Sequence, residues 1–302
     1  MSPTGNDSNN GTSPSTPWAT PNHAGLACGD VIVAAQGDYS SSWTTGLSSQ
    51  PGACPSSSGG IDGKGGIYFV TVLCAGNVGA CTMTGTAPYG NVLGVYANNW
   101  AVEGFQLSSS RVGSSGERLF VANACASGTK HVHHVAFIND IGYHSQEGFG
   151  TDECAINHNV PGNGVDYFAV IGSLAQNANN DPICLAAIDV VAPSNWDINA
   201  GTHIIFAGNF AINNQTTACG NSDTEGMMFD TFDAHGFVGT SVIKNNMIWL
   251  SGWAGLQVFE QSYNSSSPTI DVLNNTLYAN DQCTQFAVYA TGEINIQVDG
   301  GW

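Results

Sequence analysis

Short apolar runs, separated by Gly, Ser and Asn, follow one another along most of the chain. Clear examples occupy residues 30–35, 67–73, 92–96 and 101–107. Runs of this length between turn-forming residues are typical of β-strands. No long window keeps the 3.6-residue apolar period of an amphipathic helix. The pattern therefore predicts an all-β chain built from many short strands.

From residue 131 onward, this pattern repeats. A small polar residue recurs inside an apolar run at Asp140, Ser173, Asn209, Asn246 and Asn275, at steps of 33, 36, 37 and 29 residues. Each repeat carries a second apolar strand, expected at residues 149–152, 186–189, 227–230, 256–259 and 286–289. A unit of two or three strands that repeats with loops of variable length describes one coil of a parallel β-helix.

The recurring polar residues have a physical role in such a coil. Asn side chains that stack at a corner can hydrogen-bond along the stack, which satisfies amides that would otherwise be buried without partners. We therefore expect these five polar residues to lie on successive coils at one inner corner.

Three segments also carry a resemblance to a known family: residues 28–33, 242–246 and 252–258. On these segments the chain resembles the right-handed parallel β-helix proteins of the pectate lyase-like superfamily, over residues 25–302. The Asn-Thr-Asp, Gly-Asp-Asp and Arg-Ile-Lys signatures of the polygalacturonase branch are absent, so the resemblance implies the architecture more than the activity. Residues 1–24, rich in Ser, Thr, Asn, Pro and Gly, are expected to form a low-complexity arm or linker.

A Glu-Gly-x-x-x-Asp motif occurs twice, at residues 147–152 and 225–230, and between the copies an apolar run ends on Asp189. Alternate residues of a strand face opposite sides. The alternation predicts an external column of Asp152, Asp189, Asp230, Phe259 and Tyr289. A second external column is predicted beside it, made of Gly150, Ala187, Met228, Gln257 and Ala287.

Stacked aspartates on coils about 4.8 Å apart would repel one another unless a cation, a shared proton or a positioned base relieved the charge. The candidate catalytic residues are Asp152, Asp189, Asp230, Glu147, Glu225 and His235. Phe259, Tyr289 and Gln257 are the candidate substrate-binding residues, since aromatic rings suit stacking on sugars. The alternative is that the aspartates are structural, because Asp favours the turn after a strand.

Other polar residues are weaker candidates. His131, His133 and His134 start a strand and are expected to be surface histidines rather than metal ligands. His203 could carry protons beside the aspartates. Lys244 is expected to be a solvated lysine that faces outward between Ala207 and Leu273.

Charge and cysteine content limit the partners and the compartment. The chain has 23 acidic and five basic residues, a formal net charge of −18. This excess of negative charge excludes nucleic acid and anionic membranes as expected partners. Nine cysteines without zinc-site spacing indicate disulfides in an oxidising compartment, and Cys283 is the expected unpaired thiol. With no membrane-spanning run and no signal peptide, we expect the mature region of a secreted protein.

The expected function is therefore that of a secreted, monomeric enzyme that binds a polysaccharide on an external groove and cleaves it. A hydrolase would use two of the carboxyl groups, spaced about 5 Å apart for retention of configuration or about 6.5–9.5 Å apart for inversion. A hydrolase needs no cofactor. A pectate-type lyase would instead hold Ca²⁺ with Asp152, Asp189 and Asp230. A non-catalytic adhesin-like or carbohydrate-binding surface module is the third alternative.

Overall fold

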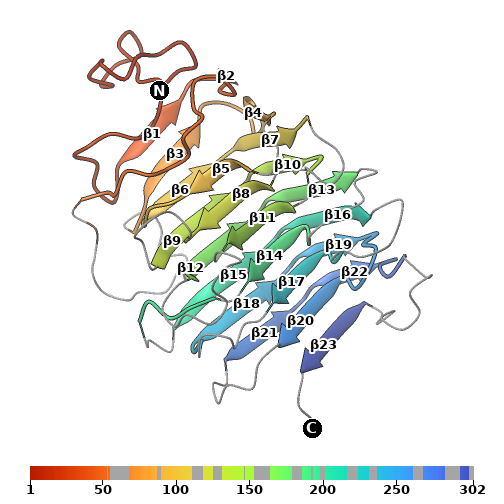
Figure 1. The fold of residues 1–302 in the computed structure, drawn as a ribbon. Helices are drawn as coiled ribbons and strands as arrows, with labels where there is room; N and C mark the ends of the chain where they lie inside the picture. Colours follow the sequence, from red (N-terminus) through yellow and green to blue (C-terminus); the bar gives the residue numbers. More distant parts are fainter. Residues whose placement is uncertain are drawn as a thin grey trace.

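The protein is an all-β, right-handed parallel β-helix (Figure 1). The computed structural model describes residues 1–52, 54, 68–86, 90–110, 118–124, 131–145, 147–152, 164–178, 186–191, 193–197, 201–215, 224–230, 237–260, 268–282 and 293–298. Within these residues the strands form three sheets, and all strand pairs are parallel. No described helix could span a membrane.

Sheet 1 has eight strands in chain order. They are β1 (Val31–Ala34), β3 (Val70–Cys74), β6 (Trp100–Glu103), β9 (His131–Ile138), β12 (Gly164–Ile171), β15 (Thr202–Ala207), β18 (Thr240–Lys244) and β21 (Thr269–Leu273).

Sheet 2 also has eight strands in chain order. They are β2 (Gly37–Asp38), β4 (Cys81–Gly85), β7 (Phe105–Ser109), β10 (Ile141–Tyr143), β13 (Leu174–Ala178), β16 (Phe210–Gln215), β19 (Met247–Trp249) and β22 (Thr276–Tyr278).

Sheet 3 has seven strands. They are β5 (Asn91–Val95), β8 (Arg118–Asn123), β11 (Glu147–Asp152), β14 (Ile188–Val191), β17 (Met227–Asp230), β20 (Leu256–Glu260) and β23 (Ile294–Val298). Each coil after the first contributes one described strand to each sheet, and the side chains that point inward from all three sheets form one core. Aromatic rings pack along that core, as in the Phe120–Phe149 stack with ring centroids 4.7 Å apart.

The predicted corner stack is confirmed between sheets 1 and 2. The Ser173 backbone N–H donates to Asn209 Oδ1 (2.9 Å), and Asn209 Nδ2 donates to Asn246 Oδ1 (3.1 Å). Asn246 Nδ2 donates in turn to Asn275 Oδ1 (2.9 Å). Asp140 begins this ladder and accepts the backbone N–H of Phe105 (2.7 Å); burial raises its pKa well above the ordinary value. The ladder fixes the vertical alignment of the coils.

Local chain geometry explains why these corners recur in the sequence. The residue before each ladder position has a positive φ, which Gly and Asn tolerate best. The φ values are 53° at Asn139, 64° at Gly172, 68° at Gly208, 57° at Asn245 and 54° at Asn274. Each corner is therefore a two-residue signal, a left-handed residue followed by a polar ladder residue.

Sheets 2 and 3 approach each other closely, and small residues make this possible. A Cβ added to Gly148 would lie 2.9 Å from the Ala175 Cβ, and one added to Gly226 would lie 2.1 Å from Ile248 Cγ2. The Gly of each Glu-Gly-x-x-x-Asp motif is therefore required by packing at this edge.

The N-terminal segment, residues 1–24, lies against the first coil. The Met1 amino group donates to the Val33 carbonyl (2.6 Å), and the Met1 side chain joins the core. Disulfides Cys28–Cys54 and Cys74–Cys81 tie this end together. Disulfides are compatible with an extracellular protein. Cys283 lies outside the described residues.

Candidate functional site

The outward face of sheet 3 carries the carboxyl groups, but one of them lies in a different column from the prediction. Asp189 is opposite Met228, and Val191 is opposite Asp230. Met228 is in turn opposite Gln257, and Asp230 is opposite Phe259. The single predicted column of three aspartates is therefore wrong: Asp189 belongs to the column of Met228 and Gln257.

The misplacement has a simple cause. The prediction ended the strand at Asp189, where the apolar run from residue 185 stops, but β14 continues through Val190 and Val191. The resulting slip is two residues, and a slip of two keeps every side chain on its face. Asp189 therefore still faces outward, because its neighbours Ile188 and Val190 belong to the core.

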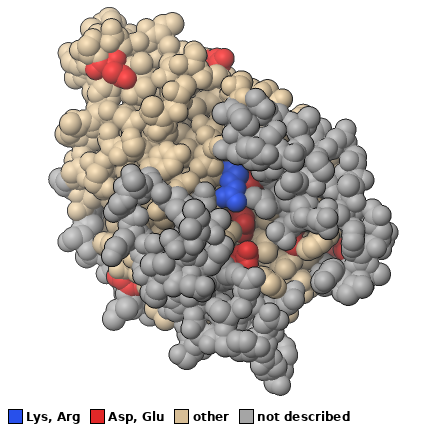
Figure 2. Space-filling model, viewed as in Figure 1, with Lys and Arg blue, Asp and Glu red and all other residues tan. Residues whose placement is uncertain are grey.

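Glu147 forms the centre of the carboxyl cluster. A Cβ on Gly150 would lie 1.4 Å from Glu147 Oε1, so the Glu147 carboxylate lies directly over Gly150 on the outward face. Arg118, opposite Glu147 on β8, places Nε 3.0 Å from Glu147 Oε2. The Glu147 side chain is 1% exposed and that of Arg118 is 26% exposed. Figure 2 shows a basic side chain beside acidic ones near the middle of the face drawn there.

Asp189 is the carboxyl group next to this ion pair. Phe149 is opposite Ile188, so Gly150 and Asp189, the residues that follow them, face each other on adjacent strands. Adjacent strands are about 4.8 Å apart, so the Asp189 side chain starts about one strand spacing from the Gly150 position that the Glu147 carboxylate covers. Asp189 is buried, as are Met228 and Gln257 next to it in the column. The arrangement is a paired-carboxylate site with one cation.

The second copy of the motif lies two coils further on. Along the edge of sheet 3, Ala186 lies between Glu147 and Glu225. The next residue, Ala187, donates its backbone N–H to the Glu225 carbonyl, which places Ala186 beside Glu225. Glu225 is fully buried. Two coils correspond to about 9.6 Å. Glu147 and Glu225 are thus a more distant carboxyl pair.

The remaining predicted site residues are placed as follows. Phe259 is half-buried next to Asp230, as predicted. The backbone of Asp152 ends β11, and its side chain lies outside the described part of the structure. His235 and Tyr289 lie outside the described residues. The strand opposite β20 is β23 rather than residues 286–289, and Gln297 takes the place expected for Tyr289 beside Phe259.

No group of three His, Cys, Asp or Glu side chains among the described residues is arranged to hold a metal ion. Since Asp189 is not in line with Asp230, the calcium site of the lyase hypothesis lacks the single column on which it was based.

The histidines form a separate buried cluster on the outward face of sheet 1. His133 and His134 are buried, which corrects their prediction as surface residues. Their Nδ1 atoms are 2.9 Å apart, and the His133 ring stacks on Trp196 at 4.0 Å. Burial, followed by the neighbouring His134 and His131, lowers the pKa of His133 to about 3. His131 contacts Ser194, with 3.0 Å between Nδ1 and Oγ.

His203 belongs to this cluster and not to the carboxyl cluster. Its Nδ1 lies 2.6 Å from Asp166 Oδ1, and both side chains are fully buried. The predicted role of His203 beside the aspartates of sheet 3 is therefore wrong. Lys244 is exposed and pairs with Ala207 and Leu273, as predicted.

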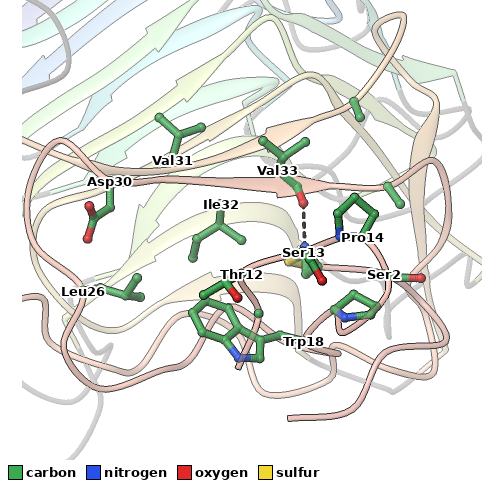
Figure 3. Close-up of a pocket in the computed structure, with 15 residues that line it drawn as sticks. Ser2, Thr12, Ser13, Pro14, Trp18, Leu26, Asp30, Val31, Ile32 and Val33 are labelled. Atoms are coloured by element: carbon green, nitrogen blue, oxygen red, sulfur yellow. Dashed lines mark hydrogen bonds between the residues drawn. The ribbon is translucent and has the colours of Figure 1, made fainter. Parts of the chain in front are cut away.

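A cavity of about 780 Å³ lies at the N-terminal end, between the arm and β1 (Figure 3). Trp18, Leu26, Ile32 and Pro14 contribute to its mostly apolar lining, and Asp30 is the only acidic side chain among the described residues that line it. Asp30 Oδ2 accepts the Ala27 N–H (2.8 Å). The cavity contains none of the carboxyl cluster, so we do not assign the chemistry to it.

Arg118 is the residue of this cluster that the sequence prediction missed. It is one of only five basic residues in the chain and starts an apolar run that ends at Ala122. Basic residues are scarce in this chain. A search for the carboxyl group that each of them could pair with would have identified Arg118 as a candidate. No protein-family model matches the chain, and no curated protein sequence is similar to it.

Proposed function

We propose that the protein is a secreted glycoside hydrolase that cleaves a polysaccharide on the outward face of sheet 3, within the pectate lyase-like superfamily that its sequence resembles. The observation that supports this proposal best is the Arg118–Glu147 ion pair with Asp189 beside it. Carboxyl groups carried by adjacent strands, whose spacing is about 4.8 Å, suit the separation of about 5 Å in hydrolases that retain the anomeric configuration.

The cation distinguishes the roles of the two carboxyl groups. A retaining hydrolase needs one ionised carboxylate as nucleophile and one protonated carboxyl group as general acid. The Arg118 guanidinium, 3.0 Å from Glu147, favours the ionised form of Glu147. Glu147 is therefore the nucleophile, and Asp189 donates the proton to the leaving oxygen. In the second step, Asp189 takes a proton from the water that releases the sugar.

The surroundings favour a neutral substrate. The chain carries a net charge of −18, and a polyanionic substrate would be repelled by it. Half-buried Phe259, next to Asp230 on the same face, offers an aromatic ring for a sugar further along the groove. Hydrolysis is for this reason preferred over elimination from a uronate polymer.

A panel of soluble polysaccharides tests the proposal, with new reducing ends and ultraviolet absorbance of unsaturated ends measured with and without a chelator. Wild type should release reducing ends without that absorbance and independently of the chelator. Glu147→Gln and Asp189→Asn should each lower the rate by at least about 100-fold. Asp271→Asn, an exposed aspartate on β21, is the matched control and should keep full activity.

Thermal unfolding of each variant separates loss of catalysis from loss of fold. Unsaturated products that form only with Ca²⁺ would favour the lyase hypothesis over the hydrolase. Binding without any product would favour the adhesin-like module. Full activity of both folded carboxyl variants would show that this cluster is structural.

A further inference from the structure

The outward face of sheet 2 presents a row of mostly apolar and aromatic side chains. Inward positions of its strands are occupied by core residues such as Ala175, Ala211 and Ile248, so the residues on either side of them point outward. The outward residues, in strand order from β10 to β22, are Ile141, Tyr143, Leu174, Gln176, Phe210, Ile212, Met247, Trp249, Thr276 and Tyr278.

These side chains are accessible. Tyr278 is 64% exposed, Phe210 44%, Trp249 40% and Met247 39%. Single exposed apolar residues are common, but a contiguous row on adjacent strands marks an interaction surface. Trp249 and Tyr278 lie on neighbouring coils with ring centroids 6.2 Å apart.

The described strands of this face carry no charge over most of its length. Strands β4, β7, β10, β13, β16, β19 and β22 contain no Asp, Glu, Lys, Arg or His residue. Asp38, on β2 at the first coil, is the nearest charged residue within the strands of this sheet. The chain has a net charge of −18, so this uncharged surface suits a neutral ligand. Its described strands from β4 onward provide no charged group that could bind an ionic ligand.

The polar groups of the row are hydroxyls and amides. Thr82 and Thr84 on β4 and Gln106 and Ser108 on β7 continue the row toward the N-terminal coils. They can donate and accept hydrogen bonds without charge, as a polyhydroxyl ligand requires. Aromatic rings in turn pack on the C–H faces of sugar rings, and the coils repeat about every 4.8 Å, roughly the length of one sugar ring.

From these observations we propose that the outward face of sheet 2 binds a neutral polysaccharide chain, laid along the axis of the solenoid across β10 to β22. Trp249 and Tyr278 contribute most of the affinity, and Phe210 and Met247 extend the platform. The site is separate from the carboxyl cluster on sheet 3 and does not depend on the proposed hydrolysis. A second copy of this chain is a poor occupant, because two chains of net charge −18 repel each other.

Depletion binding at 4 °C tests the proposal, with amorphous cellulose, insoluble β-1,3-glucan and chitin as neutral probes and polygalacturonate as the anionic probe. Wild type should bind at least one neutral probe and not the polygalacturonate. The double variant Trp249→Ala/Tyr278→Ala should bind that neutral probe at least about 10-fold more weakly. Val31→Ala/Val33→Ala, which removes two equally exposed side chains from β1 on sheet 1, should bind like wild type.

Thermal unfolding and sedimentation velocity complete the experiment. Both double variants should unfold at the wild-type temperature, since exposed side chains contribute little to stability. Unchanged affinity of the Trp249→Ala/Tyr278→Ala variant, or failure of wild type to bind every neutral probe, would overturn the proposal. So would a wild-type dimer that this variant converts to a monomer, because the face would then be a protein interface.

Discussion

At the scale of single residues, burial decides which ionisable groups are unusual. His133 lies on the outward side of β9, yet it is 8% exposed and packed against Trp196 and His134. Alternation along a strand predicts the side to which a residue points, but not whether another segment covers that side. The sequence therefore predicted surface histidines where the fold has a buried cluster.

The lowered pKa of His133 predicts a loss of stability in acid. Folding favours the neutral form of His133. The resulting contribution to the free energy of unfolding is fully present above the unfolded-state pKa of about 6.5 and is lost as the pH falls toward about 3. His133→Phe keeps a ring against Trp196 and removes the titrating group. The variant should lose less unfolding free energy than wild type between pH 7 and pH 4.5.

Urea unfolding at several pH values measures this difference. His23→Phe is the matched control, because His23 lies in the N-terminal arm, away from the cluster. Equal pH dependence of wild type and His133→Phe would show that the buried cluster is not the source of acid sensitivity.

At the scale of strands and corners, the polar ladder was predictable and the register of sheet 3 was not. A ladder corner depends on two consecutive residues, such as Asn245 and Asn246, and is therefore visible in the sequence. The strands of sheet 3 follow loops of different length, so nothing local relates Asp189 on β14 to Asp230 on β17. The apolar end of β14, Val190 and Val191, determines their actual alignment.

The tight edge between sheets 2 and 3 predicts the effect of a single methyl group. An added Cβ at Gly226 would meet Ile248 Cγ2 at 2.1 Å and the Gly255 carbonyl oxygen at 2.9 Å. Gly226→Ala should therefore destabilise the fold by about 1–3 kcal/mol. Thermal or urea unfolding measures the change.

Gly90→Ala is the control for this substitution. A Cβ at Gly90 would meet no heavy atom of the described residues within 4 Å, and its φ is not in the left-handed region. That variant should be as stable as wild type. A Gly226→Ala protein of wild-type stability would mean that the two sheets can separate at no cost and that the motif glycine has another role.

At the scale of the whole molecule, the three sheets give the solenoid faces of different character. Sheet 3 carries the Arg118–Glu147 pair, sheet 1 the buried histidines, and sheet 2 the uncharged aromatic row. The repeat and the composition predicted the architecture, because every coil needs the same corner. They did not predict which faces are covered, because that depends on loops that follow no repeat.

The stereochemistry of cleavage tests the proposed site most directly. Proton NMR of the first sugar released from a substrate of known anomeric configuration records whether that configuration is kept. Glu147 and Asp189 lie on adjacent coils. The coil spacing of about 4.8 Å predicts retention, and Glu147→Gln should abolish the signal. An inverted product would contradict the account, because it requires carboxyl groups further apart, such as a pair separated by two coils.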